Sequence, residues 1–186
     1  KPREISKLIE SNGGVRNEDV GAGLLLRAST MLIEDSSFVS NRMNGAWGDY
    51  SYGSGICAER SSGVIEDGRL EYNTMRGDDC NACFGGGGGI AFLDGYWLVH
   101  RSVFLGNVGQ DGGAYLVQSP AYGAAFFGLR GRYDLRSLVI ASNTVGTNAA
   151  ATGSGIKTMY SPLTIENCVL ANNLRGAALD AGTGSA

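Results

Sequence analysis

Proline, histidine, excess basic charge and long apolar runs are all scarce in this sequence. Its 186 residues include 3 prolines and 1 histidine, and 18 acidic side chains outnumber 15 basic ones to give a net charge of -3. Because no basic stripe is available to neutralise phosphates, nucleic acid is not an expected partner. No apolar run approaches the roughly 20 residues that cross a bilayer, so no membrane span is expected in this segment.

Glycine, by contrast, is abundant. The chain contains 30 glycines, yet 43% of its residues are hydrophobic. Disordered glycine-rich chains usually lack such apolar content, so a folded chain is expected. A length of 186 residues fits one domain, or part of one, with a substantial core.

Four cysteines are present, and two of them form a Cys-x-x-Cys motif. Cys80 and Cys83 make the motif, while Cys57 and Cys168 stand apart. A zinc site would need a second pair or a histidine at suitable spacing, which the lone His100 does not supply. A local disulfide between Cys80 and Cys83 is the first expectation, with unpaired thiols and a metal site as the alternatives.

The first 20 residues allow two interpretations. The chain begins with Lys1-Pro2 rather than Met and shows no signal peptide, so processing or excision from a larger protein is expected. Residues 1–20 form either a short helical cap or a degraded first coil of the repeat described next. We favour the second interpretation, because Ile9 and Asn12 fit the apolar and asparagine positions of that repeat.

A nine-residue motif recurs five times, and the rest of the chain is arranged around it. Each copy begins with an aliphatic residue, has a large apolar residue five positions later, and closes on asparagine. The copies span residues 33–41, 65–73, 99–107, 135–143 and 165–173. Repeats of this length indicate that one structural unit is stacked on the next.

A short glycine motif precedes each copy at a fixed distance. The second glycine lies 18 residues before the asparagine in four copies, as from Gly23 to Asn41. In the remaining copy we assign Gly112-Gly113-Ala114, which lies 30 residues before Asn143 when counted from Gly113 and implies a 12-residue insertion. The assigned second glycines are Gly23, Gly55, Gly89, Gly113 and Gly155.

These units predict an all-β fold, a single right-handed parallel β-helix of five to six coils. Each unit has two short β-like runs bounded by turn residues, and none has a dozen residues of helical periodicity. The repeats are assigned to residues 21–176, and residues 177–186 to the start of a further coil or a truncated end. Open strand edges there would be covered by further coils of a longer protein or by another chain.

The recurring asparagines are expected to be structural turn residues rather than an active-site row. Asparagine tolerates the left-handed region, and its amide can bond the backbone and its stacked neighbours. The glycines open the next strand where a side chain would crowd the turn. The asparagines are Asn41, Asn73, Asn107, Asn143 and Asn173.

The combination resembles the polymorphic outer-membrane-protein repeats of bacterial autotransporters and, more widely, right-handed parallel β-helix surface proteins. Gly112-Gly113-Ala114 matches the Gly-Gly-Ala element of that family, and Phe38-x-x-Asn41 and Phe104-x-x-Asn107 match its Phe-x-x-Asn element. Other copies depart from it, with Leu70, Ile140 or Leu170 in place of Phe. The resemblance implies an extracellular or cell-surface scaffold of adhesive or structural type.

Asp78 and Asp79 are the first candidates for chemistry. With Cys80 they resemble an element of the polygalacturonase family, where aspartates act on a glycosidic bond. The rest of that family's motifs is missing, and the pair lies in a loop after Asn73. A solvated surface or a calcium site is the alternative, and no other cofactor is expected.

His100 and Arg101 are the second candidates. His100 should point outward if Val99 points inward, and a lone outward histidine is usually ordinary surface. It belongs to an outward column of acidic and basic residues: Glu34, Glu66, His100, Arg136 and Glu166. Pairing along this column is one interpretation and a carbohydrate groove is the other.

Aromatic residues in the predicted loops are the candidates for ligand binding. The loops assigned to residues 42–53, 74–88 and 115–134 interrupt the repeat, and long loops on rigid scaffolds often bind ligands. The candidates are Trp47, Tyr50, Tyr52, Tyr122, Phe126 and Phe127, with Tyr133 in the same insertion. The alternative is that these rings fold back over the coil beneath.

Two functions follow from the sequence. The first is a non-enzymatic extracellular or surface module, structural or adhesive, that binds a glycan or a protein. The second is a pectate-lyase-like or polygalacturonase-like polysaccharide lyase or hydrolase. An enzyme should bring charged side chains from several coils into one groove, whereas a binding or structural module should show paired ladders.

Overall fold

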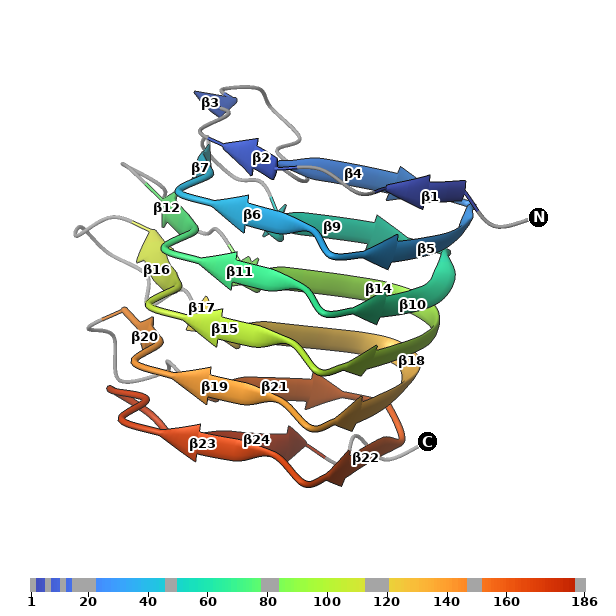
Figure 1. Ribbon diagram of the computed structural model, residues 1–186. Helices are drawn as coiled ribbons and strands as arrows, with labels where there is room; N and C mark the ends of the chain where they lie inside the picture. The colour runs from blue at the N-terminus through green and yellow to red at the C-terminus, as the bar shows by residue number, and fades with distance from the viewer. Residues whose placement is uncertain are drawn as a thin grey trace.

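The chain folds as a right-handed parallel β-helix, as the repeat predicts (Figure 1). The computed structural model describes residues 3–5, 8–10, 13–14, 23–45, 50–77, 84–112, 121–146 and 152–182. Within these ranges every regular element is a strand and every strand pair is parallel. No helix long and apolar enough to cross a membrane is found among them.

The largest sheet, sheet A, has ten strands and bends around one corner of the solenoid. Its strands are β1 (Arg3–Ile5), β4 (Leu24–Arg27), β5 (Thr30–Glu34), β9 (Ile56–Glu59), β10 (Ser62–Glu66), β14 (Ile90–His100), β18 (Phe126–Arg136), β21 (Ile156–Met159), β22 (Leu163–Glu166) and β24 (Leu179–Gly182). Most coils contribute two short strands to it. In β14 and β18 these two strands are joined into one of 11 residues.

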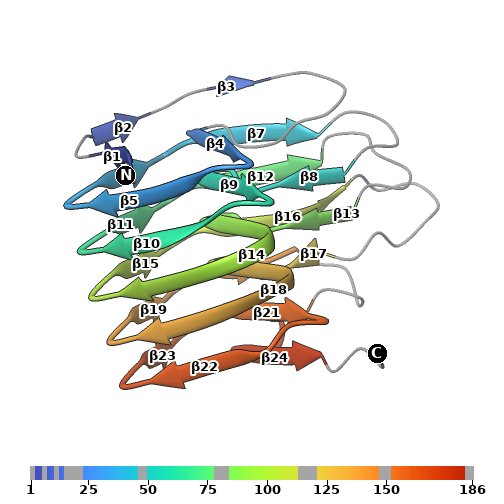
Figure 2. The same ribbon diagram turned by 90° about the vertical axis from the view of Figure 1, so that its right-hand side faces the viewer.

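Three smaller sheets close the coils (Figure 2). Sheet B contains β2 (Leu8–Glu10), β6 (Ser37–Val39), β11 (Arg69–Glu71), β15 (Val103–Leu105), β19 (Val139–Ala141) and β23 (Val169–Ala171). Sheet C contains β3 (Gly13–Gly14), β7 (Arg42–Gly45), β12 (Thr74–Gly77), β16 (Val108–Gly112) and β20 (Thr144–Val145). Sheet D contains β8 (Tyr50–Tyr52), β13 (Phe84–Gly86) and β17 (Ala121–Tyr122).

Equivalent residues of successive copies stack directly on one another. Ile33 pairs with Ile65, Ile65 with Val99, Val99 with Leu135, and Leu135 with Ile165. The first four of these side chains are fully buried, which makes the column part of the core. The solenoid has about four turns, slightly fewer than the five to six coils expected.

Sharp corners separate the strands, and a residue with positive φ lies at each of them. Three such residues fall in one coil, at Ala28 (φ 46), Asp35 (φ 43) and Ser40 (φ 55). Asp67 and Arg101 are the equivalents of Asp35 in the next two coils. Left-handed backbone turns the chain sharply without ending the ladder of interstrand hydrogen bonds. Ser40 precedes Asn41, so the left-handed position is beside the asparagine and not, as we expected, at the asparagine itself.

The five asparagines form a ladder along the inside of the solenoid. In Asn107, Nδ2 donates to Asn143 Oδ1 of the next coil (3.0 Å) and to Leu70 O of the preceding coil (2.7 Å). Its backbone N–H also donates to Asn143 Oδ1 (2.9 Å), while its own Oδ1 accepts from Asn73. Asn107 is 0% exposed, so these bonds satisfy groups that water cannot reach.

The glycine motif lies at the turn into sheet A. The assignment of its copy to Gly112-Gly113-Ala114 is wrong. A Cβ on Gly55 would collide with the carbonyl oxygen of Gly89, so a side chain is excluded there. In the fourth coil, Ile90 pairs with Phe126 and donates its N–H to Ala125 O, which puts Ala125 in the column of Gly89. Ala125 lies 18 residues before Asn143, so the 12-residue insertion counted from Gly113 does not exist. Gly113 itself lies outside the described residues.

The N-terminal residues that the structure describes are strands. β1 pairs with β5, β2 with β6 and β3 with β7, each in parallel. In this register Ile9 lies opposite Phe38. A short helix is therefore not formed at residues 3–5 or 8–10.

Aromatic rings fill the widest part of the core, between β14 and β18. Phe92 stacks on Trp97 with centroids 4.3 Å apart, and Phe126 meets Phe92 edge to face at 5.5 Å. Tyr133 is 0% exposed and lies 5.4 Å from Phe126. The assignment of residues 115–134 to an exposed loop is therefore wrong for residues 121–134. Phe126 and Tyr133 are core residues and are inaccessible to a ligand.

A second apolar cluster lies where sheet D faces sheet A. Phe127, 2% exposed, is stacked between Tyr52 and Tyr122 with both centroid distances at 5.9 Å. Gly86 leaves room for the Phe127 ring, because a Cβ there would lie 2.6 Å from it. Lys157 covers the other side of Tyr122, with Nζ 5.8 Å from the ring centroid. These loop aromatics fold back on the coil, which was the alternative to ligand binding.

Candidate functional site

The outer face of sheet A carries polar side chains from several successive coils. Side chains alternate along each strand, so every second residue of β10, β22 and the second halves of β14 and β18, after their corners, points outward. Parallel pairing aligns these residues in columns across the coils. The columns are Ser62, Tyr96 and Arg132; Val64, Leu98, Asp134 and Thr164; and Glu34, Glu66, His100, Arg136 and Glu166.

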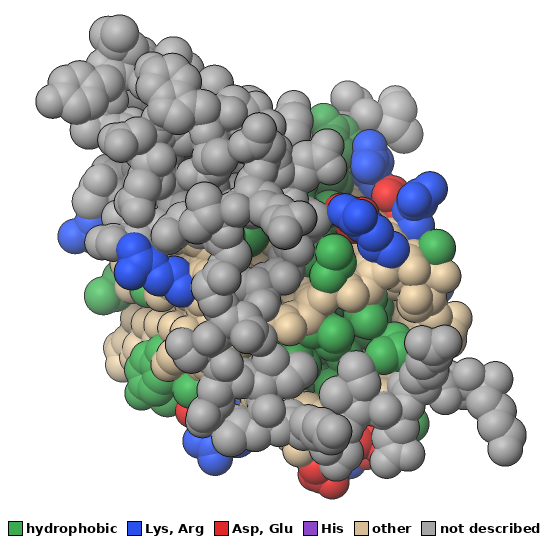
Figure 3. All heavy atoms as spheres, turned by 90° about the horizontal axis from the view of Figure 1, so that it is seen from above, with side chains coloured by type: hydrophobic (Ala, Val, Ile, Leu, Met, Phe, Trp, Pro, Cys, Tyr) green, Lys and Arg blue, Asp and Glu red, His purple; other side chains and the backbone are tan. Residues whose placement is uncertain are grey.

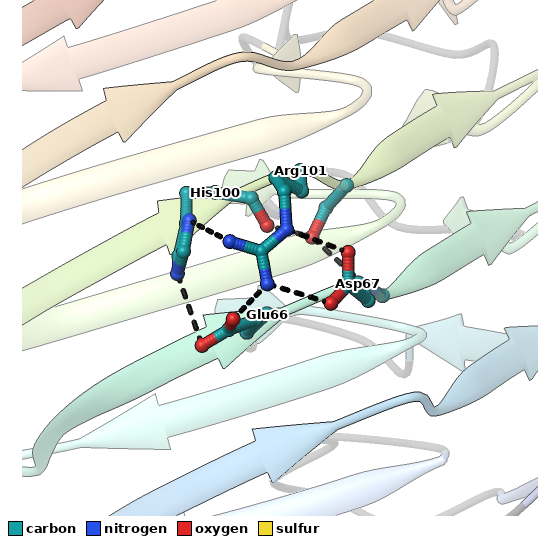
Figure 4. Close-up of polar contacts among 6 residues, drawn as sticks. Glu66, Asp67, His100 and Arg101 are labelled. Carbon is teal, nitrogen blue, oxygen red and sulfur yellow. Dashed lines mark hydrogen bonds and ion pairs between the residues drawn. The ribbon is translucent and has the colours of Figure 1, made fainter.

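At the edge of this face, four charged or polar side chains from two coils form a cluster (Figure 4). His100 ends β14 and Arg101 turns the corner after it, while Glu66 and Asp67 hold the same positions one coil earlier. Arg101 contacts Asp67 through Nε (3.0 Å) and Nη2 (2.8 Å), and Nη2 also donates to Glu66. His100 Nε2 lies 3.1 Å from Glu66 Oε2.

The hydrogen bonds of His100 assign its tautomer. Arg101 Nη1 lies 3.2 Å from His100 Nδ1, and a guanidinium can only donate, so Nδ1 must accept. Nε2 then carries the proton and donates to Glu66. Both ring nitrogens are thus engaged within the protein. A general base would need a free lone pair directed at a substrate, and this arrangement offers none.

Similar ion pairs join neighbouring coils elsewhere on the surface. Arg27 Nε lies 2.9 Å from Glu59 Oε2, and Arg130 Nε lies 3.2 Å from Asp94 Oδ1. In both pairs the partners are register neighbours in adjacent coils, or lie at the same corner. The outward column of Glu66 and His100 continues to Arg136, which contacts Glu166 at 3.6 Å. Ion pairs between adjacent coils are therefore common among the described charges, whereas Arg69 pairs with Glu71 within β11.

A second group on the same face, centred on Tyr96, was not predicted. The Tyr96 side chain is 42% exposed, its hydroxyl donates to Asp134 Oδ2 (2.9 Å), and the Arg132 guanidinium lies 5.8 Å from its ring centroid. The Asp134 hydrogen bond is the main cause that raises the pKa of Tyr96, because it holds the phenol in its neutral form. Tyr96 lies four residues before His100, so the same alternation could have placed both outward.

Asp134 is a polar residue in an unusual position. It is 5% exposed although it lies on the outer face, and its Oδ1 has no hydrogen-bond partner. Arg132 has no carboxylate partner within the part of the chain that the structure describes, and its guanidinium lies over the Tyr96 ring. The group therefore combines a partly exposed tyrosine ring with a guanidinium that lies over it and has no carboxylate partner among the described residues.

Several predicted site residues fall outside what the structure describes. The loop assignments at 46–49 and 78–83 lie there, with Trp47, Asp78, Asp79, Cys80 and Cys83. Tyr50 belongs to β8, but its side chain is not described. Across the described ranges, no group of three or more His, Cys, Asp or Glu side chains could hold a metal ion.

The two cysteines that the structure describes are both free thiols. Cys57 is fully buried in the second apolar cluster, and burial raises the pKa of its thiol. Because the thiolate is the reactive form, Cys57 behaves as a small apolar residue. Cys168 is partly exposed and its Sγ lies 3.3 Å from Glu166 O, at the corner that serines occupy in other coils.

The fold and the paired surface ladders define a parallel β-solenoid whose outer face carries polar side chains in columns. The family model described as right handed beta helix region matches residues 8–186. The chain therefore belongs to the right-handed β-helix family. No curated protein and no solved structure matches it.

Proposed function

We propose that this chain is a non-enzymatic, extracellular or cell-surface β-helix module that binds a glycan through the outer face of sheet A. The observation that carries the proposal is the exposed Tyr96 ring with the Arg132 guanidinium over it, which has no carboxylate partner among the described residues. The likeness to autotransporter-type repeats supports a surface location, and it belongs to the proposal because the family match concerns β-helices in general.

The chemistry of this face favours a sugar over a protein. A tyrosine ring offers an apolar surface to the faces of sugar rings while its hydroxyl stays polar. Arg132 can form a bidentate pair with a carboxylate, so an acidic sugar should bind more tightly than a neutral one. Leu98 and Val64, the apolar residues of the middle column, are only partly exposed and give a protein little apolar area to bury.

Calorimetric titration with oligogalacturonate and with a neutral glucan oligosaccharide tests this function. Tyr96→Ala and Arg132→Ala should each weaken binding of the acidic oligosaccharide about tenfold, a loss of about 1.4 kcal/mol. Tyr72→Ala is the matched control, because Tyr72 is also exposed (55%) but lies at a corner of the solenoid away from this face. Circular dichroism would check that each variant is folded.

Two results would contradict the proposal. One is an affinity that is unchanged by both Tyr96→Ala and Arg132→Ala. The other is an affinity that Tyr72→Ala lowers as much as they do. Binding to an unrelated protein at this face, with no glycan binding, would favour the protein partner instead.

The alternative function is a polysaccharide lyase or hydrolase, and one observation favours it. Glu66 and Asp67 from one coil meet His100 and Arg101 from the next, so charged side chains from two coils converge. Incubation with a polyuronate separates the two functions, since a lyase releases unsaturated products that absorb ultraviolet light and a hydrolase releases new reducing ends. We expect no such product. A rise in absorbance that His100→Ala abolishes would establish the alternative.

A further inference from the structure

Asp134 lies in a column of sheet A that is aliphatic in the three preceding coils. Leu32 pairs in register with Val64, Val64 with Leu98, and Leu98 with Asp134. The three aliphatic residues are partly buried at the same outward position. Stacking of the coils is therefore satisfied by an aliphatic side chain here, and a carboxylate is not needed for packing. Local departures of this kind are expected at functional sites.

The Asp134 carboxylate is buried and only partly hydrogen-bonded. Asp134 is 5% exposed, and its Oδ2 accepts from the Tyr96 hydroxyl at 2.9 Å, while Oδ1 has no partner. Arg132 and Arg136 flank Asp134 on β18, yet neither donates to Oδ1. A buried carboxylate oxygen without a donor destabilises the folded protein, so the oxygen is available for a donor that a ligand brings.

The side chain next to Asp134 on the outer face is held only weakly. Arg132 is exposed, and its guanidinium lies 5.8 Å from the centroid of the Tyr96 ring. A contact between a cation and a ring is weak at an exposed site, whereas a guanidinium and a carboxylate form a strong bidentate pair. A ligand carboxylate can therefore draw Arg132 away from the ring, which frees the ring face and gives access to the space beside Asp134.

The hydrogen-bonding groups of this site define what a ligand must offer. As a carboxylate, Asp134 can only accept, so the Tyr96 hydroxyl donates its proton to Oδ2 and offers a ligand only its oxygen. Asp134 Oδ1 is a second acceptor, while Arg132 only donates. Residues two apart on a strand are separated by about 6.6 Å, which one sugar ring with its substituents can bridge. A fitting ligand carries a carboxylate and a hydroxyl on the same ring.

We propose that Asp134 determines the specificity of this site, because its Oδ1 accepts a hydrogen bond from a hydroxyl of the sugar whose carboxylate Arg132 holds. This inference rests on the proposed function and adds that the ligand is a uronic acid with a free hydroxyl, not any anion. In the complex Oδ1 gains the donor that it lacks in the free protein. An anion without a hydroxyl leaves this oxygen unsatisfied and is held through Arg132 alone.

Asp134→Leu tests this role. Leucine is close to aspartate in shape and matches Leu98 of the preceding coil, so the variant should fold and be at least as stable as the wild-type protein. Circular dichroism and thermal unfolding would verify this. Nuclear magnetic resonance of isotope-labelled tyrosine rings then measures the binding of two probes at Tyr96. One probe is oligogalacturonate, and the other is cyclohexanecarboxylate, which has a ring and a carboxylate but no hydroxyl.

The two probes should respond differently to Asp134→Leu. Binding of oligogalacturonate should weaken about tenfold, because its hydroxyl loses the acceptor. Binding of cyclohexanecarboxylate should stay the same or tighten, because a negative charge near its carboxylate is removed. The loss of charge alone would tighten the binding of both probes, and a misplaced Tyr96 ring would weaken both. A hydrogen bond to the sugar hydroxyl is what weakens the first and not the second.

Asp35→Asn provides the control for the loss of a carboxylate. Asp35 is exposed at a corner three coils before Asp134, and asparagine tolerates its positive φ. This variant should change neither affinity by more than about twofold. An oligogalacturonate affinity that Asp134→Leu leaves unchanged or raises would overturn this inference and leave the proposed function standing, as would equal weakening of both probes. A wild-type Tyr96 ring that does not respond to oligogalacturonate would overturn both.

Discussion

At the residue scale, the buried asparagines show how position decides what an amide does. A row of five asparagines could suggest a polar active site, but Asn41, Asn73, Asn107 and Asn143 are 0% exposed. Each amide bridges two coils, so its bonds replace those that water would have made. The ladder therefore contributes to stability and not to chemistry.

The ladder predicts that an interior asparagine contributes more to the free energy of unfolding than the last asparagine, Asn173. Asn107→Ala leaves the backbone N–H and side-chain amide of Asn73 and the Leu70 carbonyl without these partners and removes one of the two bonds to Asn143 Oδ1, which should cost about 3 kcal/mol or more. Asn173→Ala should cost about 1 kcal/mol, because its position is partly open to water. Urea denaturation measures both, and equal losses would contradict the ladder.

Tyr133 gives the fold a dependence on alkaline pH. Burial raises the pKa of Tyr133, whose hydroxyl contacts the carbonyls of Phe92 (2.9 Å) and Leu129 (3.0 Å). Because the folded pKa lies above the unfolded value of about 10, the stabilisation is complete below that pH and is lost as the pH rises above it. Tyr133→Phe removes a titrating group from the core.

Denaturation of the wild-type protein and of Tyr133→Phe between pH 8 and pH 12 tests this pH dependence of stability. At pH 8 Tyr133→Phe should be less stable by about 1 kcal/mol, the value of a lost hydrogen bond. Above pH 10 the wild-type protein should lose stability faster than the variant. Parallel curves over the whole range would show that Tyr133 does not titrate differently in the two states.

At the element scale, the corners determine how the strands stack. Residues with positive φ recur at equivalent positions of successive coils, such as Asp35, Asp67 and Arg101. The following serine often caps the corner, as Ser102 Oγ donates to His100 O at 2.8 Å. Corners with the same geometry keep each strand in register with the next, which is why β14 and β18 pair along their full lengths.

Two corner glycines should respond differently to substitution. Gly95 has φ +97, and a Cβ there would collide with the carbonyl oxygen of Ser61. Gly106 has φ +62, and its nearest neighbour is the ring of Tyr72, which is exposed and can turn away. Gly95→Ala should cost about 3 kcal/mol or more and Gly106→Ala about 1 kcal/mol. Thermal unfolding of both variants would measure the difference, and similar losses would contradict it.

The register of the strands could be read from the sequence, but one coil was misplaced. The 18-residue interval predicts the stacking of Ile33, Ile65 and Val99, since equal spacing puts equal residues at equal positions. In the fourth copy, the Gly-Gly-Ala motif at Gly112-Gly113-Ala114 suggests a start that the 18-residue interval does not support. Counting 18 residues back from Asn143 leads to Ala125, which occupies the column of Gly89. The motif search missed it because the turn requires only a small residue, and alanine is small enough.

At the scale of the whole molecule, the candidate site depends on stacking between coils. Tyr96 and Arg132 are 36 residues apart in the chain and become neighbours only because β14 and β18 pair in register. Sequence alternation could place each of them outward, but their contact depends on the length of the coil between them. Seen along the axis, described Lys and Arg side chains lie toward the rim (Figure 3).

We propose that sheet A binds a glycan and does not catalyse its cleavage. A single titration tests it most directly, in which nuclear magnetic resonance follows the ring signals of isotope-labelled tyrosine as oligogalacturonate is added. The ring of Tyr96 should shift in a saturable way, while those of Tyr72 and Tyr160, both exposed elsewhere, should not. Shifts confined to Tyr72 or Tyr160, or new signals from shortened oligosaccharide in the same spectra, would contradict the account.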